Sequence, residues 1–366
     1  QATHSTMRSL AMRLAALGAL FAPDASAQKP RTPDSTATLP GVTVTATRAP
    51  SLILETPLAI TTVSAPELRG LRGFGLDEAL TLVPGVVAQS RYGTSDVRLV
   101  IRGFGARGAG DRSNAGTSRG VRVLIDGIPE TEPDGRTAFD QIDLAAAEGI
   151  EVIRSNASAD WGNAAGGVIN VRTVPASTAP ALEVQSMFGA FGLARYAARA
   201  SGPIGTGVAF VNFTNTSFDG WRDHSAARRA LFNAGLVGDV GPNTRVGFYA
   251  SGTNNLFRIP GPLTWGEAQA DPRRANATYA SRDERRYNRI ARLGATMEHD
   301  VDSTTTVSGM VFASPKYLQR SERNTFRDFT RYHVGGNVVG RHTFALAPRH
   351  DVRVAVGADE AYQDGA

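Results

Sequence analysis

The chain has 366 residues, with 39 basic and 34 acidic side chains and a formal net charge of +5. Charged residues make up 20% and hydrophobic residues 42%, a balance that excludes a disordered or coiled-coil chain. The absence of cysteine excludes disulfide scaffolds, thiol catalysis and cysteine-based zinc sites. Because the basic excess is small and comes without a basic helix or an aromatic RNA-binding motif, we expect no nucleic-acid partner.

The amino terminus has the pattern of a secretory signal peptide. A positively charged start, a short apolar core over residues 14–22 and an Ala-Ser-Ala cleavage site at residues 25–27 follow one another. We assign residues 1–27 to this signal, with residues 1–6 as read-through upstream of the true start at Met7. No other run reaches about 18 apolar residues, so we expect an exported protein without a transmembrane helix.

A linker follows over residues 28–48. Its first part, residues 28–40, is polar and proline-rich without any period, which predicts a flexible segment. Residues 42–47 (VTVTAT) alternate β-branched side chains. They predict either a strand that adds to the sheet edge of a partner protein or an ordinary first strand of the next domain.

Residues 49–174 predict a compact domain of short helices and strands. The capping box Ser64-Ala-Pro-Glu67 opens one short helix, and residues 76–83 form a second that Pro84-Gly85 ends. Strands are expected at residues 57–63, 97–101, 121–126, 150–153 and 168–171.

The stretch VRLVIRGFGARG at residues 97–108 has the glycine spacing of a dinucleotide-binding turn, at Gly103, Gly105 and Gly108. Such a turn must open a helix, because the phosphates bind at the N-terminus of that helix. Residues 109–120 have no apolar period and contain three more glycines. We therefore interpret the glycines as the beginning of an arginine-bearing loop, and we expect no cofactor.

Other catalytic patterns also lack their structural context. The sequence GTSRG at residues 116–120 matches a nucleophile elbow, but a strand rather than a helix follows it. We interpret the acidic run Glu130, Glu132 and Asp134 as a solvated loop rather than a catalytic carboxylate pair. The six histidines have no metal-ligand spacing. We therefore predict no enzyme, no catalytic residue and no metal site.

The pattern changes to long strands of period two over residues 180–366. We expect about nine strands of roughly nine to twelve residues, each with one apolar face, which favours a membrane β-barrel over a soluble sandwich. The connections alternate in length, as in outer-membrane barrels. Short ones are expected at 202–205, 240–243, 300–302 and 347–349, and long ones at 219–227, 254–287 and 314–329.

Six stretches together resemble the TonB-dependent outer-membrane receptors, in family order and spacing. They are VTVTAT (42–47), LVPGV (82–86), IRGFG (101–105), VLIDGIP (123–129), IEVIR (150–154) and WGNAAGGVIN (161–170). Two departures are local: Ser155-Asn156 stand where the family has Gly-Pro, and Trp161 stands where it has Tyr or Phe. The resemblance implies an α+β plug domain followed by an antiparallel membrane β-barrel in the cell outer membrane. About nine of an expected 22 strands are present, so we expect a fragment of a longer receptor.

The resemblance also implies partners and site residues. The partners are TonB with its inner-membrane energising complex, a ferric chelate ligand and outer-membrane lipid, and the receptor is expected to be a monomer. The implied TonB box is Val42, Thr43, Val44, Thr45, Ala46 and Thr47. The implied plug–barrel ion pairs are made by Arg102, Glu151 and Arg154.

Arginines in the expected loops predict an anionic ligand, because clustered guanidinium groups bind carboxylates in bidentate fashion. The candidate ligand residues of the apical plug loops are Arg107, Arg112, Arg119, Arg136 and Thr137, and those of the barrel loops are Arg222, Arg273 and Arg274. We therefore expect import of a siderophore or ferric-citrate-like chelate by energised plug rearrangement.

Several alternatives stay open. Within the receptor interpretation, the ligand is alternatively cobalamin, a carbohydrate or another metal complex. In others the chain is a non-transporting structural or adhesive outer-membrane barrel, or a soluble exported binding protein built from the plug alone. Independently of these alternatives, the loop arginines either contact the ligand, bind lipopolysaccharide phosphates or face solvent. Residues 28–41 are too few for an extra signalling domain, so we expect no transducer role.

Overall fold

The computed structural model describes residues 43–45, 51–53, 56–90, 96–106, 118–322, 325–347 and 350–365. All of them belong to one compact unit, Gly41–Ala366. The expected signal peptide, the linker over residues 28–40 and the candidate residues Arg107 and Arg112 lie outside the described residues. Within the described ranges, no helix is long and apolar enough to cross a membrane.

The described residues up to Arg172 form an α+β domain. Its main sheet has five strands in the order β3 (Ile60–Ser64), β9 (Gly149–Ile153), β10 (Gly167–Arg172), β7 (Val121–Ile125) and β8 (Ile128–Pro129). A second sheet consists of β4 (Val86–Ser90), β5 (Val97–Ile101) and β6 (Phe104–Gly105), and β1 (Thr43–Val44) pairs with β2 (Ser51–Leu52). The helices are α2 (Ala65–Arg69), α3 (Leu76–Leu80), the 3-10 turn η3 (Phe139–Gln141) and α4 (Ser158–Trp161).

Apolar side chains on one face of each element build the core of this domain. Helix α3 buries Leu76, Ala79 and Leu80, which the helical spacing places together, and they belong to the same cluster as Leu99 and Ile150. The predicted capping box is confirmed, because the Glu67 carboxylate accepts hydrogen bonds from the backbone N (2.7 Å) and Oγ (2.6 Å) of Ser64.

A tight hairpin turn explains the first glycines of the dinucleotide-like stretch. Arg102 (φ 49°) and Gly103 (φ 84°) form the two-residue turn between β5 and β6, where positive φ values suit the strand twist. A side chain at Gly105 would place its Cβ 2.2 Å from the carbonyl oxygen of Leu99. Gly103 and Gly105 thus lie inside a hairpin, and the interpretation that they begin a loop was wrong.

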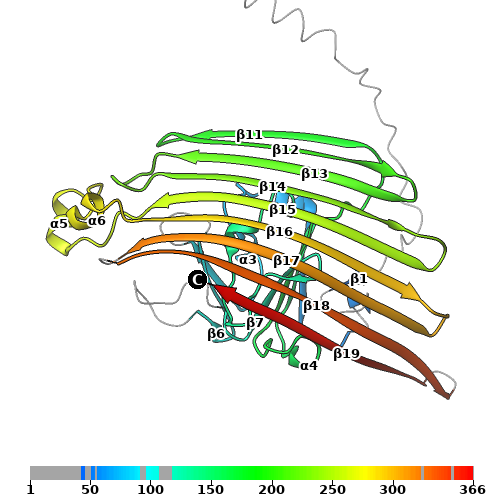
Figure 1. Ribbon diagram of the computed structural model, residues 1–366. Coiled ribbons are helices and arrows are strands. Elements are labelled where there is room, and N and C mark those ends of the chain that lie inside the picture. Colours follow the sequence, from blue (N-terminus) through cyan, green and yellow to red (C-terminus); the bar gives the residue numbers. More distant parts are fainter. Residues whose placement is uncertain are drawn as a thin grey trace, which may run out of the picture. The chain divides into compact units, whose positions relative to one another are not determined.

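The second part of the chain is a nine-stranded antiparallel sheet whose strands follow chain order (Figure 1). Its strands are β11 (Ala181–Gly189), β12 (Leu193–Ile204), β13 (Gly207–Phe218), β14 (Ala227–Asp239), β15 (Thr244–Arg258), β16 (Arg285–Asp300), β17 (Thr305–Glu322), β18 (Thr325–Ala347) and β19 (His350–Gly365). The predicted antiparallel architecture and strand number are confirmed.

The strand lengths differ from the prediction. β15 to β19 contain 15 to 23 residues rather than nine to twelve. The expected long loop over residues 314–329 was wrong, because β17 and β18 stay paired as far as Glu322 and Thr325. Their outer parts lose the apolar alternation that marks a membrane strand, yet the backbone hydrogen bonds continue.

One long connection has structure of its own. The segment between β15 and β16 contains α5 (Trp265–Ala270) and α6 (Ala277–Ser281), which project beyond one end of the sheet in Figure 1. Thr264 and Glu267 form a capping box for α5, and the side chain of Asn276 caps α6.

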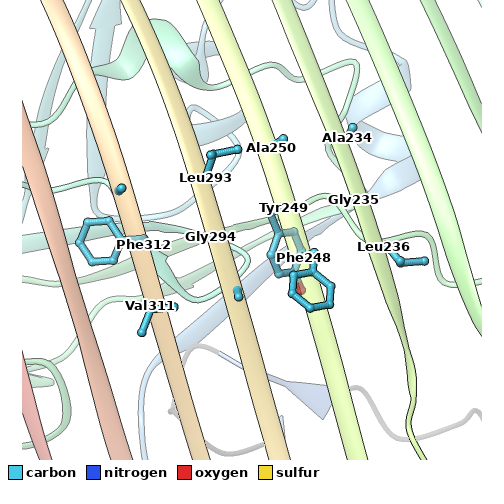
Figure 2. A pocket seen from close by; sticks show the side chains of 12 residues that line it. Ala234, Gly235, Leu236, Phe248, Tyr249, Ala250, Leu293, Gly294, Val311 and Phe312 are labelled. Atoms are coloured by element: carbon cyan, nitrogen blue, oxygen red, sulfur yellow. The ribbon is translucent and has the colours of Figure 1, made fainter.

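The two faces of the sheet differ in chemistry. Leu236, Phe248, Leu293 and Val311 lie along one face on four neighbouring strands, around an apolar hollow of about 760 Å³ (Figure 2). Alternate residues point to the opposite face, where a Cβ at Gly294 would lie 2.4 Å from the Cδ1 atom of Ile128. This second face is therefore the one that contacts the α+β domain.

Candidate functional site

The face of the sheet toward the α+β domain is polar although it is buried. Its alternating positions carry amides, hydroxyls and charges, among them Asn212, Thr214, Asn233, Asn255, Asn288, Ser314, Lys316 and His333, each less than 9% exposed. Of the three buried apolar clusters among the described residues, one joins the two parts, and it consists of Ile128 with Met310 and Phe312. The contact between the two parts is therefore mainly a matter of charge and hydrogen bonding.

The acidic run at residues 130–134 lies at the centre of this contact. Glu130 is 1% exposed and Glu132 is 4% exposed, so the interpretation of a solvated loop was wrong. The reason is long-range: the sheet supplies the counter-charges from residues as far as 199 positions away. Such partners cannot be read from the local sequence.

Lys316 on β17 joins the two glutamates. Its Nζ atom lies 3.1 Å from Glu130 and 2.8 Å from Glu132, and its side chain is 1% exposed. Arg292 on β16 adds a contact to Glu130 at 3.2 Å, and Arg331 on β18 adds one to Glu132 at 2.6 Å. We call these five residues the acidic-loop cluster.

The cluster keeps the Glu132 carboxylate ionised. Burial alone raises the pKa of the Glu132 carboxyl, but the Lys316 ammonium and the Arg331 guanidinium outweigh burial and hold that pKa below its ordinary value of 4.5. Glu130 also accepts a hydrogen bond from the Gln141 amide at 3.0 Å. The partner charges offset the desolvation cost of burying these carboxylates. Removal of one partner would leave an uncompensated buried ion.

Further contacts use backbone carbonyls as acceptors. The half-buried side chain of Arg229 on β14 donates to the carbonyl oxygens of Asp140 (2.7 Å), Ile142 (2.6 Å) and Phe74 (2.9 Å). The Asp140 carboxylate itself accepts from the amides of Asn255 (2.6 Å) and Asn288. On β12, next to the edge strand β11, Arg199 pairs with Glu148.

The residues predicted to join plug and barrel make different contacts. Glu151 lies 3.1 Å from the Nε atom of Arg172 and accepts hydrogen bonds from the backbone N (2.9 Å) and Oγ1 (3.0 Å) of Thr45. Arg154 donates to the carbonyl oxygen of Pro84, and Arg102 is exposed in its hairpin turn. These contacts lie within the α+β domain, so the predicted ion pairs to the sheet stay a prediction.

The predicted ligand residues fall into two groups. Arg119 and Arg136 are exposed on neighbouring loops of the α+β domain, with the Arg119 Cγ atom 3.8 Å from the Cβ position at Gly135. Thr137 is buried, and its hydroxyl lies 2.6 Å from the Ser118 hydroxyl and 2.9 Å from that of Thr131. Its side chain therefore holds these loops together, and its contact with a ligand stays a prediction.

The predicted barrel-loop arginines connect two loops to each other. Arg222 donates to the carbonyl oxygens of Gly261 (2.8 Å) and Arg274 (2.9 Å). Arg273 donates to the carbonyl oxygen of Trp221 at 3.2 Å, and the Arg274 guanidinium lies 4.0 Å from Glu267. The structure thus gives Arg222 and Arg273 a role in loop architecture, and their part in ligand binding stays a prediction.

Sequence reasoning missed the acidic-loop cluster altogether. One signal was available, because Lys316 is one of only two lysines among the 39 basic residues of the chain. An ammonium is a compact point charge that fits between two carboxylates, whereas a guanidinium is a wide planar fork. A lone lysine among so many arginines therefore marked a position with special geometry.

Comparison with known proteins identifies a family for the first part of the described chain. Residues 53–168 match the TonB-dependent Receptor Plug Domain. A vitamin B12 transporter BtuB of Vibrio vulnificus is 28% identical over 190 residues, which are 51% of this chain and 29% of that protein. The vitamin B12 transporter BtuB of Photobacterium profundum is 26% identical over 277 residues, or 72% and 41%. The chain thus spans less than half the length of these relatives.

Solved structures share the fold at low sequence identity. The unliganded ferric citrate transporter FecA superposes with a TM-score of 0.73 at 17% identity, over 86% of this chain and 48% of that one. The ferric yersiniabactin uptake receptor FyuA from Yersinia pestis gives a TM-score of 0.67 at 17% identity, over 84% and 49%. Residues 53–168 are thus a TonB-dependent Receptor Plug Domain, and the chain shares with these solved structures the fold of a plug followed by strands of the barrel.

Proposed function

We propose that the chain forms part of an outer-membrane receptor that imports a ferric chelate by TonB-driven rearrangement of its plug. The observation that carries this proposal is the buried but charged contact between plug and sheet, with the acidic-loop cluster at its centre. The apolar outer face of the sheet, with Phe248 and Val311 exposed, suits lipid.

A charged interface can be opened and closed again at modest cost. Water replaces the partners of a carboxylate or an ammonium when the two surfaces separate, whereas exposure of an apolar interface costs about 25 cal/mol per Å². A plug held by apolar packing would therefore resist displacement in proportion to its area. The polar contact supports a plug that moves while its own apolar core stays intact.

The proposed TonB box has a defined attachment within the plug. Thr43 and Val44 pair with Leu52 and Ser51, and Thr45 bonds to Glu151 on β9. Because β9 lies between β3 and β10 in the main plug sheet, a pull on the box acts directly on that sheet. Strand addition to a partner's sheet edge would replace the β1–β2 pairing with a stronger connection.

The proposed ligand class follows from the positive charge of exposed plug residues. The exposed arginines Arg119 and Arg136 on the plug favour an anionic, carboxylate-bearing chelate. Cobalamin is the second candidate, because the sequence relatives reported above are named vitamin B12 transporters. Both candidates require an energised receptor, and they differ in the charge that the ligand presents.

Two measurements on the intact receptor test this proposal. Isothermal titration with ferric citrate and with cobalamin identifies the ligand class, and binding of cobalamin alone would overturn the iron proposal. Deletion of residues 42–47 should abolish energised uptake while ligand affinity stays unchanged, since the box lies outside the candidate ligand residues. Uptake that survives the deletion would overturn the TonB-box assignment.

A further inference from the structure

Three arginines lie directly opposite one another across neighbouring strands. In the sheet register Arg286 on β16 faces Arg320 on β17, and Arg320 faces Arg327 on β18. Adjacent strands are about 4.8 Å apart, so this arginine row spans about 10 Å. Cross-strand partners share a face of the sheet, and Arg286 contacts Asp96 of the plug at 2.6 Å. The row therefore faces the plug.

Opposed like charges are unfavourable in a sheet, and this row is only partly neutralised. Asp96 and Asp140 act electrostatically on Arg320, but so does a further cation, Arg136 of the plug. The Asp140 carboxylate already accepts hydrogen bonds from two asparagine amides. Within the described residues, the Nε atom of Arg320 is buried without a hydrogen-bond partner.

Other cations on the same face of the sheet are matched with carboxylates. Lys316 has two carboxylates within 3.1 Å, and Arg331 has Glu132 at 2.6 Å and Asp134 at 3.4 Å. The paired cations and the arginine row lie on the same face of the same sheet. The surplus positive charge at the row is thus a local property and not a general feature of this face.

We propose that Arg286, Arg320 and Arg327 form a binding site for a ligand that carries two or more carboxylate groups. The proposal rests on the receptor function proposed above and names the chemistry that the receptor recognises. Each guanidinium offers parallel donors that match a carboxylate, and a polycarboxylate such as a citrate-type chelate can contact several of them at once. Lipopolysaccharide phosphates lie outside the barrel and do not reach a plug-facing row.

The site is also connected to the plug. Arg136 lies within electrostatic range of Arg320, and its guanidinium is 3.6 Å from Asp134. Asp134 in turn contacts Arg331 of the acidic-loop cluster. A carboxylate that draws Arg136 toward the row would weaken its hold on Asp134. Ligand occupancy would thereby reach the ion pairs that hold the plug.

The first test measures affinity for ferric citrate on the intact receptor. Arg320→Gln and Arg327→Gln should each raise Kd about 10-fold to 100-fold, because a hydrogen bond to a charged group contributes about 1.5–3 kcal/mol and 1.4 kcal/mol is tenfold in Kd. Arg289→Gln is the matched control. Arg289 is stacked on Tyr287 and Tyr317, and it lies three residues from Arg286 on the same strand, which places it on the opposite face of the sheet. Its Kd should equal that of the wild type.

A second measurement separates a binding role from a structural one. Removal of one charge from a repelling row should raise the thermal midpoint of the ligand-free receptor in Arg320→Gln and shrink the stabilisation that ferric citrate provides. A lower midpoint together with unchanged affinity would overturn the site. The arginine row would then be a structural charge cluster and not a binding site.

The outcomes keep the site and the receptor function distinguishable. If the wild type binds ferric citrate and both row variants bind it equally well, the site is wrong and the iron receptor stands. If the wild type binds cobalamin and no ferric chelate, the proposed function is wrong, and iron-free citrate then tests the row. Citrate binding that is lost in Arg320→Gln supports the site, and no citrate binding to the wild type overturns it as well.

Discussion

The core of the plug and its contact with the sheet are equally buried but chemically opposite. Leu99 and Val152 in the core are at most 1% exposed, and so are the side chains of Glu130 and Lys316 at the contact. In the core, burial removes apolar surface from water and contributes roughly 1.5–3 kcal/mol for each large side chain. At the contact, burial costs solvation that the partner charges must offset. Equal burial therefore stabilises the apolar core, whereas the contact with the sheet consists of charged pairs whose partners water can replace.

This difference separates folding from movement. The proposed function displaces the plug as a unit and so needs a plug interior that is stable without its surroundings. The plug clusters are made from plug residues alone apart from the Ile128 contact. Its surroundings must then hold it by contacts that can be remade after separation. The predictions below test whether the two regions behave in these two ways.

The largest effect is expected for Lys316→Ala. Loss of the ammonium leaves Glu130 and Glu132 buried together with less compensation, which should weaken plug docking by about 3–5 kcal/mol. Plug docking can be followed by protease accessibility of the plug in outer-membrane vesicles and by sensitivity of cells to large antibiotics. Both should increase.

A rescue variant and a core variant sharpen this result. Removal of one charge of each sign in Glu132→Gln/Lys316→Met should restore docking to near the wild-type level, because Glu130 keeps Arg292 and Arg331 keeps Asp134, so that no ion is left unpaired. Ile150→Ala in the plug core should destabilise by about 2–5 kcal/mol through a cavity that no charge change can rescue. If the double variant leaks as much as Lys316→Ala, the contact depends on shape rather than charge.

A smaller effect follows from the lowered pKa of Glu132. Since its pKa in the folded receptor lies below 4.5, the stabilisation is complete above that value and is lost as the pH falls through the lowered value. The difference in thermal midpoint between wild type and Glu132→Gln should therefore be constant from about pH 7 to about pH 5 and shrink toward about pH 3. A difference that grows on acidification would contradict the assignment of the charged form.

The smallest effect is expected for Thr45→Val. Valine removes the hydroxyl contacts to Glu151 and Asn170 but keeps the backbone hydrogen bond to Glu151. The loss should be about 1 kcal/mol, or a several-fold larger released fraction of the box. A spin label near residue 47 reports that fraction, and an unchanged spectrum would show that the hydroxyl does not restrain the box.

The sequence predicts what depends on local pattern and fails where distant strands meet. The strand at 97–101, the capping box at Ser64 and the antiparallel sheet follow from periodicity and local turn chemistry, and the structure has them. The burial of Glu130 depends on β16 and β17, which lie more than 150 residues away. The arginine row depends on cross-strand register, which no single strand contains.

The scarcity of lysine has a practical consequence for chemical labelling. Lys29 and Lys316 are the two lysines of the whole chain, and Lys29 belongs to the segment before the plug. An amine-reactive reagent therefore has a single lysine target in the plug and sheet, and that target is closed while Glu130 and Glu132 cover it. Acylation of Lys316 would record each departure of the plug from the wall as a covalent mark, without any engineered residue.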